Sequence, residues 1–295
     1  MSKIFVSGLV NLEMSLQVDY FPIQYNPIEY PFFGISQAVS GVGYNVSKAL
    51  SILGDDAFLT GFIGDDLFSK NIKETLESEH INFSFEKSKS LQTPTSLVLF
   101  DKDGKRKIYC DLKDLQEMNL DVREIDFNSY DLFVITNINF NRSLIKKCKS
   151  SKCKIATDVH CISSIDDNFN KDFMMNADYL FLSNEYVKGN EADFIKIIYE
   201  KYNNEIIVIG CGSEGALAYC GKENKYYYSQ ARAPFGVKST VGAGDALFSS
   251  FLHFYLKNKD IQKSLNLATL FAGCKVSKNG GSNGFIDEKR LVNLL

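Results

Sequence analysis

A lone carboxylate follows three small residues near the C-terminal end of the chain. The stretch STVGAGDALFSSFL, residues 239–252, places Asp245 directly after Gly242, Ala243 and Gly244. The apolar run after Asp245 is long enough for a buried helix, and the small residues leave the backbone amides at its start unobstructed. Such amides, together with the helix dipole, bind anions such as a phosphoryl group. We therefore predict an anion hole at the start of this helix.

Asp245 suits two roles at this position. A carboxylate beside a phosphate repels it, so its presence is explained if it acts as a general base that takes a proton from an attacking hydroxyl group. Aspartate is also common at helix starts, where it caps backbone amides. From this motif alone, catalysis and capping are equally open.

A second glycine-rich turn, SGVGYN, lies in the first quarter of the chain. Gly41 and Gly43 permit close approach of the backbone, and Asn45 offers both a donor and an acceptor, which suits a polyhydroxylated ligand. Asn11 and Glu13 follow the first predicted strand, at the end where open α/β sheets bind their ligands. Each residue also has a purely structural interpretation, with Asn45 as a helix cap and Glu13 as a solvated side chain.

Other motifs argue against different classes of site. GCGSEG, residues 210–215, matches the dinucleotide fingerprint G-x-G-x-x-G, but the residues after it indicate a strand and a polar turn instead of the required helix. The Walker motif G-x-x-x-x-G-K-[ST] does not occur. The three histidines are scattered without metal-ligand spacing, and His253 is expected to be a packed or surface residue. A dinucleotide-dependent oxidoreductase is therefore disfavoured.

Alternating strand and helix patterns must position these residues. KIFVSGLV predicts a first buried strand, and the helical spacing after SGVG predicts a helix that ends at Gly54. Further strands are predicted in AFLTGFIG, YDLFVITNI, CKIATDV, ADYLFLS and NEIIVIG. This order predicts one α/β domain over residues 1–295, with a doubly wound, mainly parallel sheet and helices on both faces.

Two segments, about residues 13–35 and 91–112, lack intervening helices. Their extended, polar-alternating pattern and the turn sequence DKDG predict a small β-sheet lid built from two separate pieces of chain. Surface loops with an edge hairpin are the alternative. The aromatic stretch YFPIQYNPIEYPFFG is expected to pack the lid on itself or to stack on a ligand ring.

Composition excludes several partners. The 295 residues carry 33 basic and 36 acidic side chains, a net charge of −3 with no basic field, so nucleic acid and anionic membranes are not expected as partners. Seven cysteines without C-x-x-C spacing fit a reducing compartment. With no leader-like or membrane-spanning stretch evident, we predict a cytoplasmic protein.

SGVGYNVSKALSILG and STVGAGDALFSSFL together resemble the two signature regions of the ribokinase (PfkB) family of carbohydrate and nucleoside kinases. GFIGDDLFSKNI and QTPTSLVLFDKDGKRKI also lie where that family has similar segments, so the resemblance covers essentially the whole chain. It implies a ribokinase-like fold with a β-sheet lid, transfer of phosphate from Mg-ATP to a sugar or nucleoside hydroxyl, and a homodimer formed through the lids. A non-catalytic sugar- or nucleoside-binding member of the same fold stays open as the alternative.

The resemblance also implies roles for individual positions. Asp245 corresponds to the catalytic base, and the anion hole to Gly242, Ala243 and Gly244. Substrate contacts correspond to Asn11, Glu13, Gly41, Val42, Gly43 and Asn45. Nucleotide contacts correspond to Asn184, Gly212, Gly215, Thr240, Gly242, Gly244, Ala272 and Lys275. Glu185 is the metal candidate, acting through water.

Five positions depart from the family pattern. Glu13 stands where aspartate is usual, and Ser40 replaces the first glycine of the sugar loop. Ser239 replaces an acid common at the start of the signature, which weakens the case for a bound monovalent cation. Val187 stands where the family's Asn-x-x-Glu element, which lies near the magnesium ion, has its glutamate, so this acid is missing here. DVH at 158–160 replaces the usual Asp-x-Asn.

Overall fold

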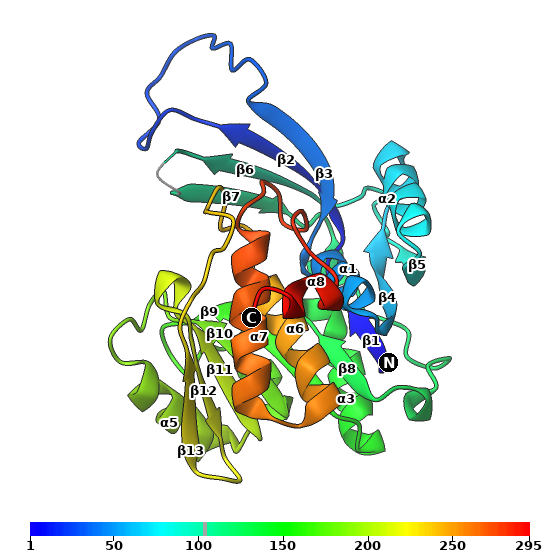
Figure 1. The fold of residues 1–295 in the computed structure, drawn as a ribbon. Coiled ribbons are helices and arrows are strands. Elements are labelled where there is room, and N and C mark those ends of the chain that lie inside the picture. The colour runs from blue at the N-terminus through cyan, green and yellow to red at the C-terminus, as the bar shows by residue number, and fades with distance from the viewer. Residues whose placement is uncertain (103–104) are drawn as a thin grey trace.

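A large, mostly parallel sheet forms the centre of the protein (Figure 1). The structure, a computed structural model, describes residues 1–102 and 105–295. Seven strands of the large sheet are parallel neighbours, and an antiparallel pair, β12 and β13, extends one edge. In spatial order the strands are β13 (Lys225–Ser229), β12 (Ala216–Cys220), β11 (Ile206–Gly210), β10 (Tyr179–Ser183), β9 (Ile155–Cys161), β8 (Leu132–Ile135), β1 (Lys3–Ser7), β4 (Asp56–Ile63) and β5 (Asn82–Lys87).

Helices cover both faces of this sheet because successive side chains of a buried strand point to opposite sides. In β1, Ile4 and Val6 pack in one core with the helices α1, α2, α6 and α7, whereas Phe5 packs in a second core with α3, α4 and α5. The helices are α1 (Val42–Leu53), α2 (Leu67–Ser78), α3 (Arg142–Ser151), α4 (Lys171–Asn176), α5 (Glu191–Tyr202), α6 (Ala243–Asn258), α7 (Ile261–Lys275) and α8 (Glu288–Val292). The predicted doubly wound architecture is confirmed.

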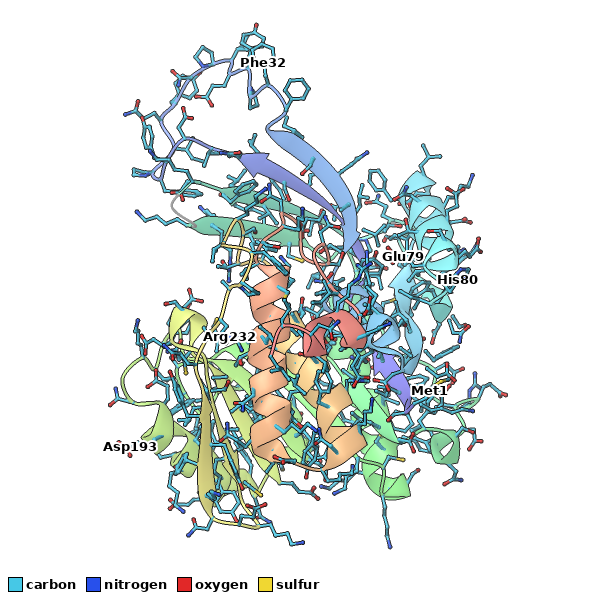
Figure 2. The ribbon with its side chains drawn as sticks, viewed as in Figure 1. Met1, Phe32, Glu79, His80, Asp193 and Arg232 are labelled. Atoms are coloured by element: carbon cyan, nitrogen blue, oxygen red, sulfur yellow. The ribbon has the colours of Figure 1, made fainter. Side chains whose placement is uncertain are left out.

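A smaller, separate sheet stands over one end of the large one (Figure 1). Its strands, in spatial order, are β3 (Ile35–Ser40), β2 (Asn11–Gln17), β6 (Thr95–Phe100) and β7 (Arg106–Asp111). The two chain segments expected to build a small sheet do so, although β2 begins two residues before the expected start and β3 ends five residues after the expected end. Between β2 and β3 runs a long loop, and Figure 2 shows Phe32 at its tip.

Two local predictions can be compared with this fold, and a third falls partly outside the described residues. Gly54 ends α1 in the left-handed conformation, as predicted. After β11 the chain makes one short 3-10 turn, Gly212–Glu214, and then enters strand β12 instead of an α-helix, which confirms that GCGSEG is no dinucleotide fingerprint. The turn predicted at DKDG includes residues 103–104, which lie outside the described residues.

Of the helices in the described ranges, none has the length and apolar character needed to cross a membrane.

Candidate active site

Asp245 lies in the first turn of the buried helix α6. The helix begins after Gly242, which adopts a left-handed φ of 78° and supplies no side-chain cap. Asp245 is 8% exposed, and its Oδ2 accepts a hydrogen bond of 2.7 Å from Nδ2 of Asn45. Asn45 belongs to α1, which packs directly against α6. The carboxylate therefore faces a partner 200 residues away instead of folding back to cap its own helix, which disfavours the capping interpretation.

Close packing joins the turn at Gly242 to the glycine-rich turn at residues 40–45 through the segment around Gly281. A Cβ at Gly242 would lie 1.9 Å from the carbonyl oxygen of Gly281, so only glycine fits there. A Cβ at Gly281 would in turn lie 2.8 Å from Nδ2 of Asn45 and 3.0 Å from Oγ of Ser40. Three segments far apart in the sequence thus meet at one place, and the turn around Gly281 forms the junction between the other two.

Buried polar groups lie at the start of β2 and the end of β3. Glu13 accepts hydrogen bonds from the hydroxyls of Ser15, at 3.0 Å, and of Ser40, at 2.9 Å, so two departures from the family pattern contact each other. Asn11 is the register partner of Ser40 across β2 and β3. The Oδ1 atoms of Asn11 and Asn45 are buried and have no hydrogen-bond partner among the described residues. Because buried acceptors are normally satisfied, these two atoms fit hydroxyl donors of a ligand.

The glycines of the turn at residues 40–45 also have a clear packing role. Gly41 has a φ of 101°, and a Cβ there would lie 2.5 Å from the carbonyl oxygen of Leu9. A Cβ at Gly43 would lie 2.8 Å from the backbone of Gly8. The start of α1, at Val42, therefore lies directly against the chain that leaves β1. This contact by itself requires both glycines.

Several charges surround the carboxylate of Asp245. Burial raises its pKa, while the hydrogen bond from Asn45 and the nearby His160 and Lys275 oppose that rise and Asp158 adds to it. A carboxyl group with a raised pKa is a better proton acceptor than a solvated one. Asp158 is buried in β9, and a Cβ at Gly244 would lie 3.9 Å from its Oδ2. Asp158 is the first residue of the DVH segment that the sequence analysis noted at the place of the family's Asp-x-Asn.

The predicted nucleotide residue Asn184 lies buried just after β10. Its backbone amide donates to the carbonyl of Gly210 at 3.0 Å, and its Nδ2 donates to Oε1 of Glu191 at 2.7 Å. The sequence analysis missed Glu191, which opens α5 four residues after Val187. Glu185 is exposed and accepts a hydrogen bond from the Cys161 thiol at 3.1 Å. The acid beside Asn184 is thus Glu191, whereas Glu185 bonds elsewhere.

The remaining predicted nucleotide contacts differ in their surroundings. A Cβ at Gly212 would meet nothing within 4 Å, whereas one at Gly215 would lie 2.0 Å from the Ser229 carbonyl oxygen. Thr240 accepts a hydrogen bond of 2.6 Å from the Arg106 guanidinium on β7, so the small sheet contacts the segment that precedes the anion hole. Sequence reasoning did not anticipate this contact. Ala272 is partly buried and Lys275 is fully buried, both near the end of α7.

Asn184 and two glutamates near it, Glu185 in the sequence and Glu191 by its hydrogen bond, carry side-chain oxygen atoms. Among residues 1–102 and 105–295, His, Cys, Asp and Glu side chains form no group of three that could hold a metal ion on their own. Asn184, Glu185 and Glu191 offer the oxygen ligands that magnesium prefers. These residues therefore fit a magnesium ion that keeps most of its own waters.

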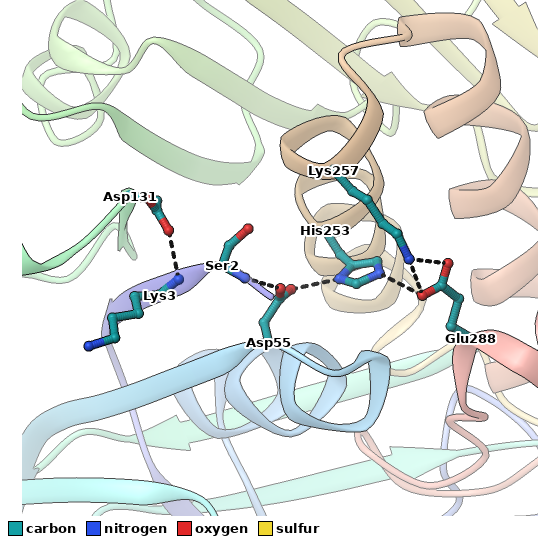
Figure 3. Close-up of polar contacts among 7 residues, drawn as sticks. All are labelled: Ser2, Lys3, Asp55, Asp131, His253, Lys257 and Glu288. Carbon is teal, nitrogen blue, oxygen red and sulfur yellow. Dashed lines mark hydrogen bonds and ion pairs between the residues drawn. The ribbon is translucent and has the colours of Figure 1, made fainter.

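A buried polar network orients α6 further along its length (Figure 3). His253 is buried, and its Nδ1 lies 2.7 Å from Oδ2 of Asp55, whose Oδ1 accepts a hydrogen bond of 3.0 Å from the Ser2 amide. Nε2 of His253 lies 3.6 Å from Oε2 of Glu288, which also pairs with Lys257 at 2.6 Å. His253 is thus a packed residue, and it ties the helix that carries Asp245 to the N-terminus, to the start of β4 and to α8.

Comparisons with known proteins agree with this arrangement. The family model described as pfkB family carbohydrate kinase matches residues 1–289. A ribokinase of Dictyostelium discoideum is 24% identical over 314 residues, which cover 96% of this chain and 97% of the relative. A microbiome-derived acarbose kinase has a TM-score of 0.89 at 22% identity and is similar over 99% of this chain and 98% of its own. A ribokinase from Cryptococcus neoformans var. grubii serotype A, solved in complex with ADP, has a TM-score of 0.80 at 19% identity, with both chains covered at 100%.

The structural neighbours show the fold, and the family model extends over both glycine-rich signature regions. The relatives are named as kinases. This agrees with a buried carboxylate at the start of a helix whose first amides can bind an anion. The chain belongs to the pfkB family of carbohydrate kinases.

Proposed function

We propose that this protein transfers the γ-phosphoryl group of ATP to a hydroxyl group of a sugar or a nucleoside. The observation that carries the proposal is the buried carboxylate of Asp245, held by Asn45 in the first turn of α6. A general base and electrostatic stabilisation of the phosphoryl oxygens are the two things such a transfer needs from a protein. Membership of the kinase family and the ADP in a ribokinase neighbour support the choice of ATP.

Buried acceptors orient the substrate in this proposal. Hydroxyl groups of the substrate donate to the unsatisfied Oδ1 atoms of Asn11 and Asn45. Glu13, already held by Ser15 and Ser40, accepts a further hydroxyl group. Because glutamate is one methylene longer than the usual aspartate, the hydroxyl pattern accepted here differs from that of relatives with the shorter acid. Substrate choice therefore depends on Glu13 and Ser40 together.

The chemical step uses the start of α6. Asp245 accepts the proton of the attacking substrate hydroxyl group. The oxygen of that hydroxyl group bonds to the γ-phosphorus, and the bond from the γ-phosphorus to the oxygen that bridges to the β-phosphate breaks, which releases ADP. The amide of Ala243 already donates to the Thr240 carbonyl at 3.2 Å. The amides of Gly244 and Asp245, in a helix turn whose N–H groups have no intrahelical acceptor, donate to the phosphoryl oxygens.

Magnesium supplies positive charge at the phosphate oxygens when it is bound. Asn184 and the Glu191 bonded to it would hold its water ligands, and the exposed Glu185 next to Asn184 in the sequence would add a carboxylate through water, because magnesium prefers oxygen ligands. The nucleotide lies along the turn at Gly212 and Gly215. Arg106 of β7 donates a hydrogen bond to the hydroxyl of Thr240, which precedes α6. From this position its guanidinium can pair with a phosphate of the nucleotide.

The small sheet serves as a lid in this proposal. It belongs to the same single domain, residues 1–295, as the large sheet. The loop between β2 and β3 exposes the aromatic rings of Tyr30, Phe32 and Phe33; Figure 2 shows Phe32 at the tip of this loop. Exposed apolar patches of this kind mark contact surfaces, and a second copy of the lid would cover them. Light scattering that gives a monomer at all concentrations would contradict the dimer without affecting the proposed chemistry.

The proposed activity is tested by ADP release from Mg-ATP with pentoses, hexoses, sugar phosphates and nucleosides as acceptors. The Asp245→Asn variant is measured in parallel. Turnover with one acceptor class that disappears in the variant establishes the kinase and identifies its substrate class. Ligand-induced thermal stabilisation without ADP release from any acceptor would instead indicate a binding protein of the same fold.

A further inference from the structure

Asp66 lies in the segment GFIGDDLFSKNI, residues 61–72, and has no role in the chemistry proposed above. It is the N-cap of α2: its Oδ1 accepts a hydrogen bond of 2.9 Å from the Ser69 amide, and its own amide donates to the Ser69 hydroxyl at 3.1 Å. This reciprocal pair is a capping box, which stabilises the start of a helix. Capping by itself needs only one oxygen of the carboxylate.

Thr93 supplies two further hydrogen bonds to the same carboxylate. Its amide donates to Oδ2 of Asp66 at 2.8 Å, and its hydroxyl donates to Oδ1 at 2.6 Å. The hydroxyl oxygen also accepts from the Gly64 amide at 3.1 Å, and a Cβ at Gly64 would lie 2.5 Å from the Thr93 nitrogen. Thr93 is 1% exposed, so it is packed tightly on the turn between β4 and α2.

The carboxylate of Asp66 is charged when it makes these contacts. Burial works against its ionisation, but the hydrogen bonds from Thr93 and Ser69 outweigh burial and lower the pKa of Asp66. At neutral pH these are therefore hydrogen bonds to a charged acceptor, which are stronger than neutral ones.

Thr93 stands where the chain passes from the large sheet to the small one. β5, at the edge of the large sheet, precedes it, and β6 of the small sheet begins two residues after it. The carbonyl of Pro94 accepts a hydrogen bond of 3.2 Å from the amide of Leu12 in β2. Leu12 lies between Asn11 and Glu13, which we propose to accept substrate hydroxyl groups. The helix α2 also packs against β2 and β3.

We propose that Asp66 is a positioning residue that anchors the small sheet through Thr93 and so holds Asn11 and Glu13 at the substrate. The proposal rests on the proposed function, because it concerns the same substrate contacts. One carboxylate serves both the start of α2 and the connection into β6. The small sheet therefore cannot shift relative to α2 without loss of hydrogen bonds to a charge. Asp66 contacts neither substrate nor nucleotide in this role.

Variants at two positions separate anchoring from capping. Thr93→Val keeps the branched shape of the side chain but removes the hydroxyl donor, whereas Thr93→Ser keeps the donor. Asp66→Ser keeps a preferred capping residue but provides neither the charge nor the second oxygen that Thr93 contacts. Asp65→Asn is the matched control, because Asp65 is the exposed neighbouring acid and pairs with Lys87 instead.

Hydrogen exchange of backbone amides tests the anchor without any substrate. In Thr93→Val and Asp66→Ser, we expect the amides of β2 and β6 to exchange about tenfold faster or more, as loss of one hydrogen bond to a charged group predicts. Amides of β8 and β9 should keep their wild-type rates, and Thr93→Ser and Asp65→Asn should exchange as wild type does.

Three results of this experiment would overturn the proposal. They are unchanged exchange of β2 and β6 in either folded variant, equal acceleration across all strands, and the same acceleration in Asp65→Asn. If Thr93→Val fails to fold, Asp66→Ser decides alone. Failure of both variants to fold would show a role in global stability and would also overturn the anchor.

Acceptor kinetics provide the second test once an acceptor is known. The KM for the acceptor is expected to rise about tenfold in Thr93→Val and Asp66→Ser, with a smaller change in kcat, because the base in α6 is unchanged. Ser69→Ala removes only the capping partner, so it should lower stability without a rise in this KM. An unchanged KM in Thr93→Val and Asp66→Ser, or an equal rise in Ser69→Ala, would overturn the proposal. Wild type without turnover on every acceptor would instead defeat the proposed function, and the exchange experiment would still decide the role of Asp66.

Discussion

Replacement of Asp245 by asparagine removes a proton acceptor while it keeps the shape of the side chain. The amide oxygen of the new residue can still accept the 2.7 Å hydrogen bond from Nδ2 of Asn45. Geometry is therefore retained, and the lost function is general-base catalysis, which typically contributes about 10²- to 10⁴-fold. At 1.36 kcal/mol for each tenfold change in rate, this corresponds to a barrier higher by about 2.7 to 5.4 kcal/mol.

The assay is steady-state ADP release with the acceptor found active for wild type. We expect kcat to fall by about 10²-fold or more, with little change in KM because the acceptor atoms of Asn11 and Asn45 remain. Asp193→Asn serves as the control, since Asp193 is an exposed residue of α5 and Figure 2 shows it at the lower left edge of the molecule. A wild-type kcat in Asp245→Asn would refute the assignment of the base, and an equal loss in Asp193→Asn would show that the effect is unspecific.

The same variant is expected to gain stability. Burial raises the native pKa of Asp245 above 3.8, so folding disfavours its ionised form. Such a group contributes stability that is fully present below its unfolded pKa and is lost as pH rises through the native pKa. Asp245→Asn should therefore unfold at a higher urea concentration than wild type at neutral pH, with the difference vanishing below pH 3.8. A variant less stable than wild type at neutral pH would contradict this account.

Two further variants test the framework of the site. In Gly242→Ala, a left-handed residue costs about 1–2 kcal/mol and its Cβ would lie 1.9 Å from the Gly281 carbonyl oxygen, so both thermal stability and kcat should fall. Gly54→Ala is the matched control, because Gly54 has a φ of 99° but open space around it; it should lose stability only, and an equal loss of kcat would argue against the anion hole. In His253→Leu, the buried Asp55 loses its 2.7 Å partner, and the free energy of unfolding should decrease by about 1–3 kcal/mol; an unchanged urea midpoint would show that the network in Figure 3 contributes nothing to stability.

Short-range patterns were sufficient for the main elements of the fold. The apolar run after Asp245 and the glycine at position 54 predict the start of one helix and the end of another, because helix periodicity and caps depend on residues within one or two turns. The alternation of strands and helices predicts the layered sheet for the same reason. The exact limits of β2 and β3 were missed, since pairing with β6 and with each other extends these strands beyond the expected segments.

By itself, the sequence determined that a carboxylate would lie beside free amides at the start of a buried helix. Only the tertiary structure decided what that carboxylate contacts. The bond from Asn45 joins residues 200 apart, Ser40 holds Glu13 across two strands, and Glu191 stands beside Asn184. The full burial of Lys275 at the end of α7 likewise depends on how this helix packs against its neighbours. Such contacts depend on chain topology and side-chain packing, which local spacing does not contain.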